Sequence, residues 1–322
     1  MGMEKMSMCV PSNEKEGRGF LTNRELLSSM VPLLLEWYDQ NKRKLPWREN
    51  TDPYRVWVSE IMLQQTRVDT VIPYYTRFLQ GCPDLLTLAH ISEEQLLKLW
   101  EGLGYYNRVR NMQKASQKIQ SEYGGQFPGE FERLKSLPGF GEYTAGAVGS
   151  IAFQLRVPAV DGNVLRVISR IVENKEDIAK PVVKKEISAA IQAVLPERVG
   201  DFNQSLMELG AVVCLPNGDP CCTVCPVKTL CQAYAEGSVH DIPVKAAKPD
   251  RRIEERTVFI LISQGKTLLR KRKSQGLLAG LWEFPSVEGK LKVSEAKEFL
   301  QQEGISFTKV QTFKSAKHFF PY

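Results

Sequence analysis

Five of the seven cysteines in this sequence lie within 18 residues, in a pattern that is typical of a metal site. The pattern is C-x7-C-x2-C-x5-C, formed by Cys214, Cys222, Cys225 and Cys231. In a C-x2-C pair the intervening turn brings two thiolates together, and two further cysteines complete a tetrahedral site or hold the corners of a cubane. This compact spacing favours a [4Fe–4S] cluster, with zinc as the alternative, although zinc sites more often use two C-x2-C pairs and a longer spacer. Because one loop supplies all four ligands, we expect a structural role.

Two carboxylates occur in settings that could support acid–base chemistry. Glu60 interrupts an otherwise apolar helical run, residues 56–63, where burial would raise its pKa and keep it protonated. Asp161 stands at the mouth of a helical segment, in the sequence PAVDGNV of residues 158–164. The alternatives are a surface position for Glu60 and a helix N-cap for Asp161.

Residues 134–148, LKSLPGFGEYTAGAV, predict two helices joined by a tight hairpin. The first helix should end at Leu137, and a second helix of small residues should follow the turn. Gly139 and Gly141 leave backbone N–H groups free at the start of that second helix, an arrangement suited to holding a phosphate. A plain connection between helices is the alternative.

The elements that must position these residues are helical from residue 24 to about residue 213. Apolar residues recur with helical periodicity, and prolines and glycines mark the loops. The predicted amphipathic segments are residues 26–38, 56–78, 93–99, 109–123, 144–153, 164–172, 183–195 and 202–213. Pro32 marks a possible start or kink in the first of them.

After the cysteines the composition changes. Residues 242–256 hold two prolines and eight charges and predict an extended linker. Residues 257–263 and 266–271 then predict two strands of a hairpin that turns at Gln264-Gly265, and residues 294–303 predict a helix. The expected C-terminal unit is therefore a small α/β domain.

Composition restricts the class of protein. The 322 residues include 43 Lys and Arg against 37 Asp and Glu, a net charge of +6 that permits a polyanionic partner without requiring one. Apolar runs are too short for a membrane span, and the first 23 residues lack the apolar core of a secretory signal. We therefore expect an intracellular protein without a membrane partner.

Several motifs in the same order resemble one enzyme family. Besides the hairpin, VDGNV and the cysteines, these are WR at 47–48, WVSEIMLQQT at 57–66 and GLGYYNR at 102–108. Together they resemble the MutY-type adenine DNA glycosylases, members of the helix–hairpin–helix DNA glycosylase superfamily that carry an iron–sulfur cluster. The resemblance covers residues 26–233 and resumes at residues 276–285.

The resemblance implies a DNA-associated monomer with an active site for base-excision repair of double-stranded DNA, in which adenine is removed opposite 8-oxoguanine or guanine. Cleaving the N-glycosidic bond requires a proton on the leaving base and an anion beside the sugar cation. By resemblance Glu60 protonates adenine N7, Asp161 faces the cation, and Tyr143 and Asn163 support this pair. A base inside a duplex must be flipped out, and the implied contacts to adenine and DNA are Trp47, Arg48, Leu63, Gln65, Thr66, Arg67, Tyr105, Gly139, Gly141 and Gln204, with Gln65 and Tyr105 as the wedge.

The residue at position 143 distinguishes a monofunctional glycosylase from a bifunctional glycosylase–lyase. Bifunctional relatives that resemble endonuclease three carry a lysine that forms a Schiff base with the sugar, and here Tyr143 stands in its place. A phenol cannot form an imine, so we expect a monofunctional hydrolase that leaves an abasic site. A bifunctional glycosylase–lyase and a non-catalytic iron–sulfur DNA-binding protein are the competing hypotheses.

The sequence departs from the family in two places. The usual cluster spacing is C-x6-C-x2-C-x5-C, and the extra residue here leaves a choice between Cys221 and Cys222. We choose Cys222, because the loop at residues 216–218 absorbs an insertion more easily than the C-x2-C pair does. In the C-terminal unit, residues 297–302 (KEFLQQ) replace two carboxylates of the Nudix magnesium motif with glutamines, which are poor magnesium ligands.

The predicted organisation is a mainly α catalytic region followed by a small, truncated α/β Nudix-like domain. Residues 1–23 form a flexible tail, and residues 24–235 form the glycosylase domain, with the hairpin at 134–148 and the iron–sulfur loop at 214–231. Residues 236–255 are a linker, and residues 256–322 are the lesion-recognition domain. There the nearest match to the family's Phe-Ser-His tripeptide is residues 313–315 (FKS).

Overall fold

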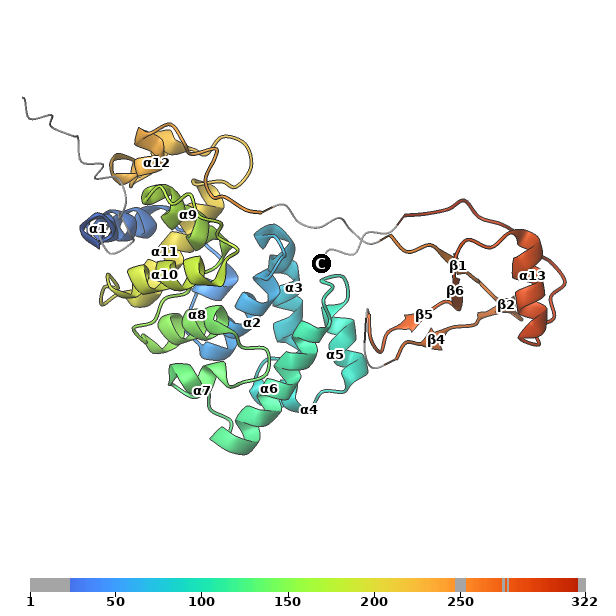
Figure 1. Cartoon of the computed structure of the whole chain (residues 1–322). Helices are drawn as coiled ribbons and strands as arrows, with labels where there is room; N and C mark the ends of the chain where they lie inside the picture. Colours follow the sequence, from blue (N-terminus) through green and yellow to red (C-terminus); the bar gives the residue numbers. More distant parts are fainter. Residues whose placement is uncertain (1–23, 247–252, 274–275, 277, 318–322) are drawn as a thin grey trace, which may run out of the picture. The chain divides into compact units, whose positions relative to one another are not determined.

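The computed structural model describes residues 24–246, 253–273, 276 and 278–317 (Figure 1). The chain divides into two compact units, residues 1–247 and 248–322. The predicted N-terminal tail lies outside the described residues. Within the described ranges, no helix has the length and apolar character that crossing a bilayer requires.

The first unit is helical, as predicted. Its short 3₁₀ turns are η2 (Pro46–Arg48), η3 (Cys222–Val224) and η4 (Lys228–Leu230). Its α-helices are α1 (Arg24–Asn41), α2 (Pro53–Leu63), α3 (Val68–Gly81), α4 (Leu85–His90), α5 (Glu93–Trp100), α6 (Asn107–Tyr123), α7 (Phe131–Lys135), α8 (Glu142–Phe153), α9 (Gly162–Ile171), α10 (Pro181–Gln192), α11 (Val199–Val212) and α12 (Gln232–Ala235).

Two helix predictions need correction. The segment predicted as one helix over residues 56–78 is two helices, because the chain leaves helical geometry between α2 and α3, where Gln65 has a φ of 60°. Pro32 does not begin a helix, since α1 contains it and starts at Arg24. The hairpin prediction holds, with α7 and α8 on either side of the turn and Gly139 at a φ of 80°.

Two apolar cores organise this unit. The first is formed by side chains of α2 to α8, and the second by side chains of α1, α9, α10 and α11. Met207 on α11 packs against both cores. Helix α8 packs on α2 and on α11, and α11 packs on α9. Residues on α2, α8, α9 and α11 therefore come together where the two cores meet.

The start of the predicted linker packs on the helical unit. Ile242 is only 1% exposed, and its carbonyl accepts a hydrogen bond of 2.8 Å from Nε of Arg170. The backbone N–H of Ile178 donates to the carbonyl of Val244. An extended, solvated linker from residue 242 is therefore wrong for residues 242–244.

The second unit holds short strands and one helix. The strands β1 (Arg256–Val258) and β6 (Ser286–Glu288), β2 (Ile262–Ser263) and β3 (Lys266–Thr267), and β4 (Arg270–Lys271) and β5 (Trp282–Glu283) form three antiparallel pairs. The β2–β3 pair confirms the hairpin at Gln264-Gly265, although the segment predicted as one strand over 257–263 is divided between β1 and β2. Helix α13 (Val293–Gln302) confirms the predicted helix, and Phe299 on it stacks on Phe259 at 5.5 Å.

The close approach of α8 to the segment before Asp161 gives a test of the fold. A Cβ at Gly146 would lie 2.2 Å from the carbonyl oxygen of Pro158, a backbone atom that has no room to move away. We predict that Gly146→Ala lowers the free energy of unfolding by about 1–3 kcal/mol, as overpacked cores do. The measurement is denaturant unfolding, with Gly129→Ala as the control because its Cβ would meet only Phe153 at 3.6 Å. Equal stability of the two variants would contradict the described packing.

Candidate active site and cysteine site

Glu60 is the buried carboxyl at the centre of the candidate site. Helix α2 is buried along most of its length, and Glu60 is only 7% exposed. Burial raises the pKa of Glu60 to about 7, and the negative charge of Asp161 acts in the same direction. The hydrogen bond from Tyr143 and the positive charge of Arg48 oppose this rise. The surface-acid alternative is therefore wrong, because Glu60 can carry a proton near neutral pH in the interior.

Tyr143 holds the Glu60 carboxyl from the facing helix. It lies in the first turn of α8, and its hydroxyl donates a hydrogen bond of 2.5 Å to Oε2 of Glu60. The same hydroxyl lies 3.3 Å from Sδ of Met207. Burial raises the pKa of the Tyr143 phenol well above 10, so this group remains a donor across the physiological range. The contact fixes the orientation of the Glu60 carboxyl.

Asp161 is both a helix cap and a member of the site. Its Oδ1 accepts from the backbone N–H of Val164 at 2.8 Å, and its Oδ2 accepts from Nδ2 of Asn163 at 2.7 Å. Burial raises the pKa of Asp161, while these donors and the charge of Arg166 favour the ionised form. Asp161 is therefore the N-cap of α9, as the alternative interpretation predicted, and the capping hydrogen bond orients its carboxylate. A proton donor and a carboxylate within electrostatic range can together cleave a glycosidic bond.

A buried arginine connects Asp161 to the cysteine loop. Nη2 of Arg166 donates to Oδ1 of Asn163 at 2.9 Å and to the carbonyl of Gly210 at 2.8 Å. Its Nε donates to the carbonyl of Cys214 at 2.8 Å. The hydrogen bonds therefore run from Asp161 through Asn163 and Arg166 to the first predicted metal ligand.

Arg48 is fixed by an anion on α11. Glu208, only 1% exposed, accepts from Nη2 of Arg48 at 2.9 Å and from both Nε and Nη2 of Arg43 at 2.8 Å. The two guanidinium groups hold the pKa of Glu208 at about 2 despite its burial. This fixed group places the positive charge of Arg48 within electrostatic range of Glu60.

Most of the predicted DNA-contacting residues lie on loops and helix ends, whereas Gln204 lies within α11. Gln65 and Tyr105 both adopt left-handed backbone geometry, with φ of 60° and 46°. Gly141 is the N-cap of α8 and has no atom near a would-be Cβ. The remaining predicted contacts are Trp47, buried against Tyr75; Leu63, Thr66 and Gln204, all half-buried; and Arg67, exposed at the start of α3.

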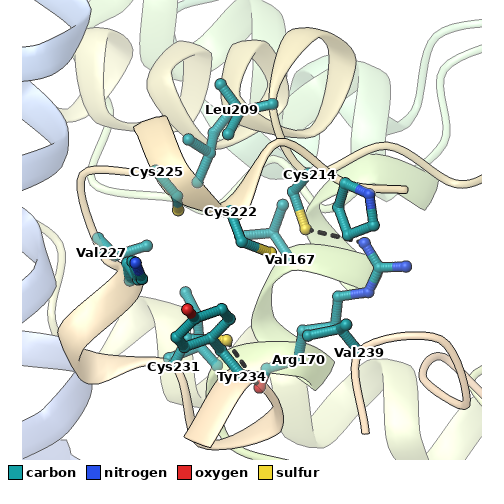
Figure 2. Close-up of a pocket in the computed structure, with 14 residues that line it drawn as sticks. Val167, Arg170, Leu209, Cys214, Cys222, Cys225, Val227, Cys231, Tyr234 and Val239 are labelled. Carbon is teal, nitrogen blue, oxygen red and sulfur yellow. Dashed lines mark hydrogen bonds between the residues drawn. The ribbon is translucent and has the colours of Figure 1, made fainter. Parts of the chain in front are cut away.

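All four predicted cysteine ligands line one cavity (Figure 2). Cys214 follows α11, Cys222 is the first residue of η3, Cys225 directly follows η3, and Cys231 is the N-cap of α12. Cys221 is exposed and does not line the cavity, which agrees with the choice of Cys222. The remaining lining is mostly aliphatic and comes from α9, α11 and the loop itself. Within the described part of the chain, no group of three or more His, Cys, Asp and Glu side chains is arranged to hold a metal ion as it stands.

The chemistry of this cavity suits a group that binds thiolates. Burial raises the pKa of the Cys225 thiol to about 12 and also raises those of Cys222 and Cys231, so a bound metal has to displace their protons. Arg170 donates from Nη1 to Sγ of Cys214 at 3.2 Å, as Figure 2 shows, and Lys228 also lines the cavity. These cations would offset the negative charge of four thiolates.

Three functional candidates were not predicted: Arg166, Arg170 and Glu208. All three are charged residues in apolar helical segments, the same signal that identified Glu60. Arg166 and Arg170 are also four residues apart, which places them on one face of α9. That spacing could have indicated a shared buried partner.

Comparisons with known proteins agree with this geometry. The family described as HhH-GPD superfamily base excision DNA repair protein matches residues 58–193, and the NUDIX domain family matches residues 257–321. A solved structure of a thermostable thymine-DNA glycosylase superposes with a TM-score of 0.59 at 27% identity, covering 67% of this chain and 99% of that one.

Two curated relatives, both adenine DNA glycosylases, are similar over most of this chain. The protein from Mus musculus is 42% identical across 79% of this chain, which spans only 59% of that relative's length. The protein from Buchnera aphidicola subsp. Baizongia pistaciae is 35% identical across 88% of this chain and 80% of its own length. Given this identity and coverage, the chain belongs to the adenine DNA glycosylase family, with an HhH-GPD region and a NUDIX-like region.

Proposed function

We propose that this protein is a base-excision-repair enzyme that removes adenine from DNA where it is mispaired with 8-oxoguanine or guanine. The observation that carries the proposal is the buried carboxyl of Glu60, whose pKa is raised to about 7 and whose orientation Tyr143 fixes. Family membership supports the substrate class, since the curated relatives carry the name adenine DNA glycosylase.

The proposed chemistry divides two roles between the two carboxyls. Protonated Glu60 gives its proton to N7 of the departing adenine and then assists the attack of water. Ionised Asp161, held by Val164 and Asn163, faces the sugar cation that develops as the bond breaks. Tyr143 cannot form an imine with the sugar, so the proposed product is an abasic site with an intact strand.

Three features support DNA as the partner. The backbone N–H groups at the start of α8, after the Gly139–Gly141 turn, can hold a phosphate. Gln65 and Tyr105 stand at the ends of two neighbouring loops, where they can fill the space that a flipped adenine leaves. The net charge of +6 favours a polyanion.

We also propose that the cysteine cavity holds a [4Fe–4S] cluster bound by Cys214, Cys222, Cys225 and Cys231. Four thiolates spread around one cavity match a cubane, in which each iron corner takes its own cysteine. When bound, the cluster would join the loop after α11 to α12 and α9. It takes no part in the proposed proton transfers.

Single-turnover kinetics test the function directly. We predict that the protein releases adenine from A·8-oxoguanine and A·G duplexes and leaves an A·T duplex intact, and that borohydride traps no covalent adduct. Removing residues 248–322 should reduce the preference for 8-oxoguanine only slightly, because Lys314 and Ser315 stand where the family has Ser and His. No adenine release from either mismatch would contradict the proposal, and a trapped adduct would support the lyase alternative.

The acid role of Glu60 predicts a sign for the pH dependence. The acid must be protonated, so the rate should fall as pH rises through about 7. Glu60→Gln should lower the rate about 10²–10⁴-fold, the usual contribution of a general acid, with duplex binding unchanged. Tyr143→Phe removes a hydrogen bond that lowers the Glu60 pKa, so its falling limb should move to higher pH. Rate–pH profiles measure both effects, and Glu132→Gln, at an exposed glutamate, is the control. If Glu60→Gln lowers the rate by less than about tenfold, Glu60 is not the general acid.

The choice between neighbouring cysteines predicts opposite results for two variants. Cys222→Ser should lose the cluster, because Cys222 lines the cavity with the other three cysteines, whereas exposed Cys221→Ser should keep it. Iron analysis and the brown absorbance of the purified proteins measure this, with about four irons per chain expected in the parent and in Cys221→Ser. The reverse pattern would assign Cys221 as the ligand, and zinc in place of iron would contradict the cluster.

A further inference from the structure

The two predicted wedge residues stand on different loops, and each has a backbone geometry that non-glycine residues rarely adopt. Gln65 lies between α2 and α3, and Tyr105 lies between α5 and α6; both have positive φ. Such conformations persist only where the surrounding structure holds them. Neighbouring side chains must therefore hold the Gln65 loop and the Tyr105 loop in these conformations.

Arg108, in the first turn of α6, contacts both loops with separate nitrogens. Its Nη1 donates to the carbonyls of Ile61 at 2.8 Å and Gln64 at 2.6 Å, at the C-terminal end of α2. Its Nη2 donates to the carbonyls of Leu103 at 3.1 Å and Gly104 at 3.4 Å, directly before Tyr105. One planar guanidinium group thus joins the residue before each wedge residue.

The surroundings hold this guanidinium in place. It lies 5.4 Å from the ring centroid of Trp100 and 5.5 Å from that of Tyr105. Trp100 adds a second donor to the Tyr105 loop, because its Nε1 bonds the carbonyl of Gly104 at 3.0 Å. Burial lowers the pKa of Arg108 to about 10, which leaves the group charged at neutral pH. The positive charge also suits the carbonyl end of α2.

We propose that Arg108 is a positioning residue that locks the Gln65 and Tyr105 loops to each other, so that both side chains enter the duplex as one preformed wedge. The loops are then ordered when the protein folds, and DNA binding does not bear that cost. This inference rests on the proposed function, since it concerns the step that exposes adenine. It assigns Arg108 no contact with the adenine or the sugar.

The test separates wedge positioning from charge and from general folding. Arg108→Lys keeps the positive charge but loses the planar fork, so one ammonium cannot serve both loops. Arg110→Lys is the matched control, because Arg110 is half-buried on the same helix and its guanidinium pairs with Glu93 on α5. Each protein is assayed at single turnover on adenine opposite guanine and on adenine opposite a tetrahydrofuran abasic analogue, where extrusion is easier.

We expect Arg108→Lys to lose at least about tenfold in rate on the A·G duplex and at most about threefold on the unpaired adenine. A second readout needs no catalysis. In the Glu60→Gln background, the fluorescence of 2-aminopurine placed beside the adenine should rise on saturation with protein, because the flipped adenine no longer stacks on it. Arg108→Lys should suppress most of that rise in fluorescence. Arg110→Lys should behave as the parent in both assays.

Equal losses on the two substrates, or full 2-aminopurine brightening with Arg108→Lys, would overturn the inference. If Arg108→Lys does not fold, Trp100→Phe gives the second test, because it removes the indole donor to Gly104 and keeps an aromatic ring at this buried position. It should show the same substrate dependence more weakly, and no dependence would overturn the inference. A parent protein that releases adenine from neither substrate would instead overturn the proposed function, while the fluorescence still tests Arg108.

Discussion

A carboxyl group enclosed by protein must either stay protonated or have its charge compensated, and this constraint on Glu60 organises the first unit. Glu60 is on α2, which is buried along most of its length, and Tyr143 on α8 donates a hydrogen bond to its carboxyl. Glu208 shows the other solution, since two guanidinium groups compensate its charge and keep its pKa low. Glu60 and Glu208 are thus buried glutamates whose pKa values are shifted in opposite directions, upward for Glu60 and downward for Glu208.

Helix α9 joins the chemistry to the cysteine loop. Its N-terminus orients Asp161, its first turn carries Asn163, and its interior supplies Arg166 and Arg170. Arg166 contacts the carbonyl of Cys214, and Arg170 contacts its sulfur. Any group that orders the cysteine loop therefore also supports the Asp161 carboxylate, although that group takes no part in the reaction itself. This is the structural role that the loop spacing predicts.

The sequence was sufficient for the helical class, the hairpin, the burial of Glu60 and the four cavity cysteines, because periodicity and cysteine spacing are local signals. It could not show that α2 ends at Leu63, since the apolar pattern continues through residue 78. The carbonyls at this helix end are bonded by Arg108, more than 40 residues away. Arg166 and Glu208 carry the same signal as Glu60, a charge in an apolar helical segment, but their roles depend on partners that come from distant segments.

The central claim is that the Glu60 carboxyl titrates near pH 7 and not in the ordinary glutamate range. The most direct measurement is the infrared difference spectrum between the parent and Glu60→Gln, in which the protonated carboxyl stretch of Glu60 is followed as pH changes. Our account predicts that this band persists well above pH 5 and declines with a midpoint near pH 7. A band that is already lost by the ordinary glutamate range of about pH 4–5 would contradict the account, because Glu60 would then be ionised when it must give a proton.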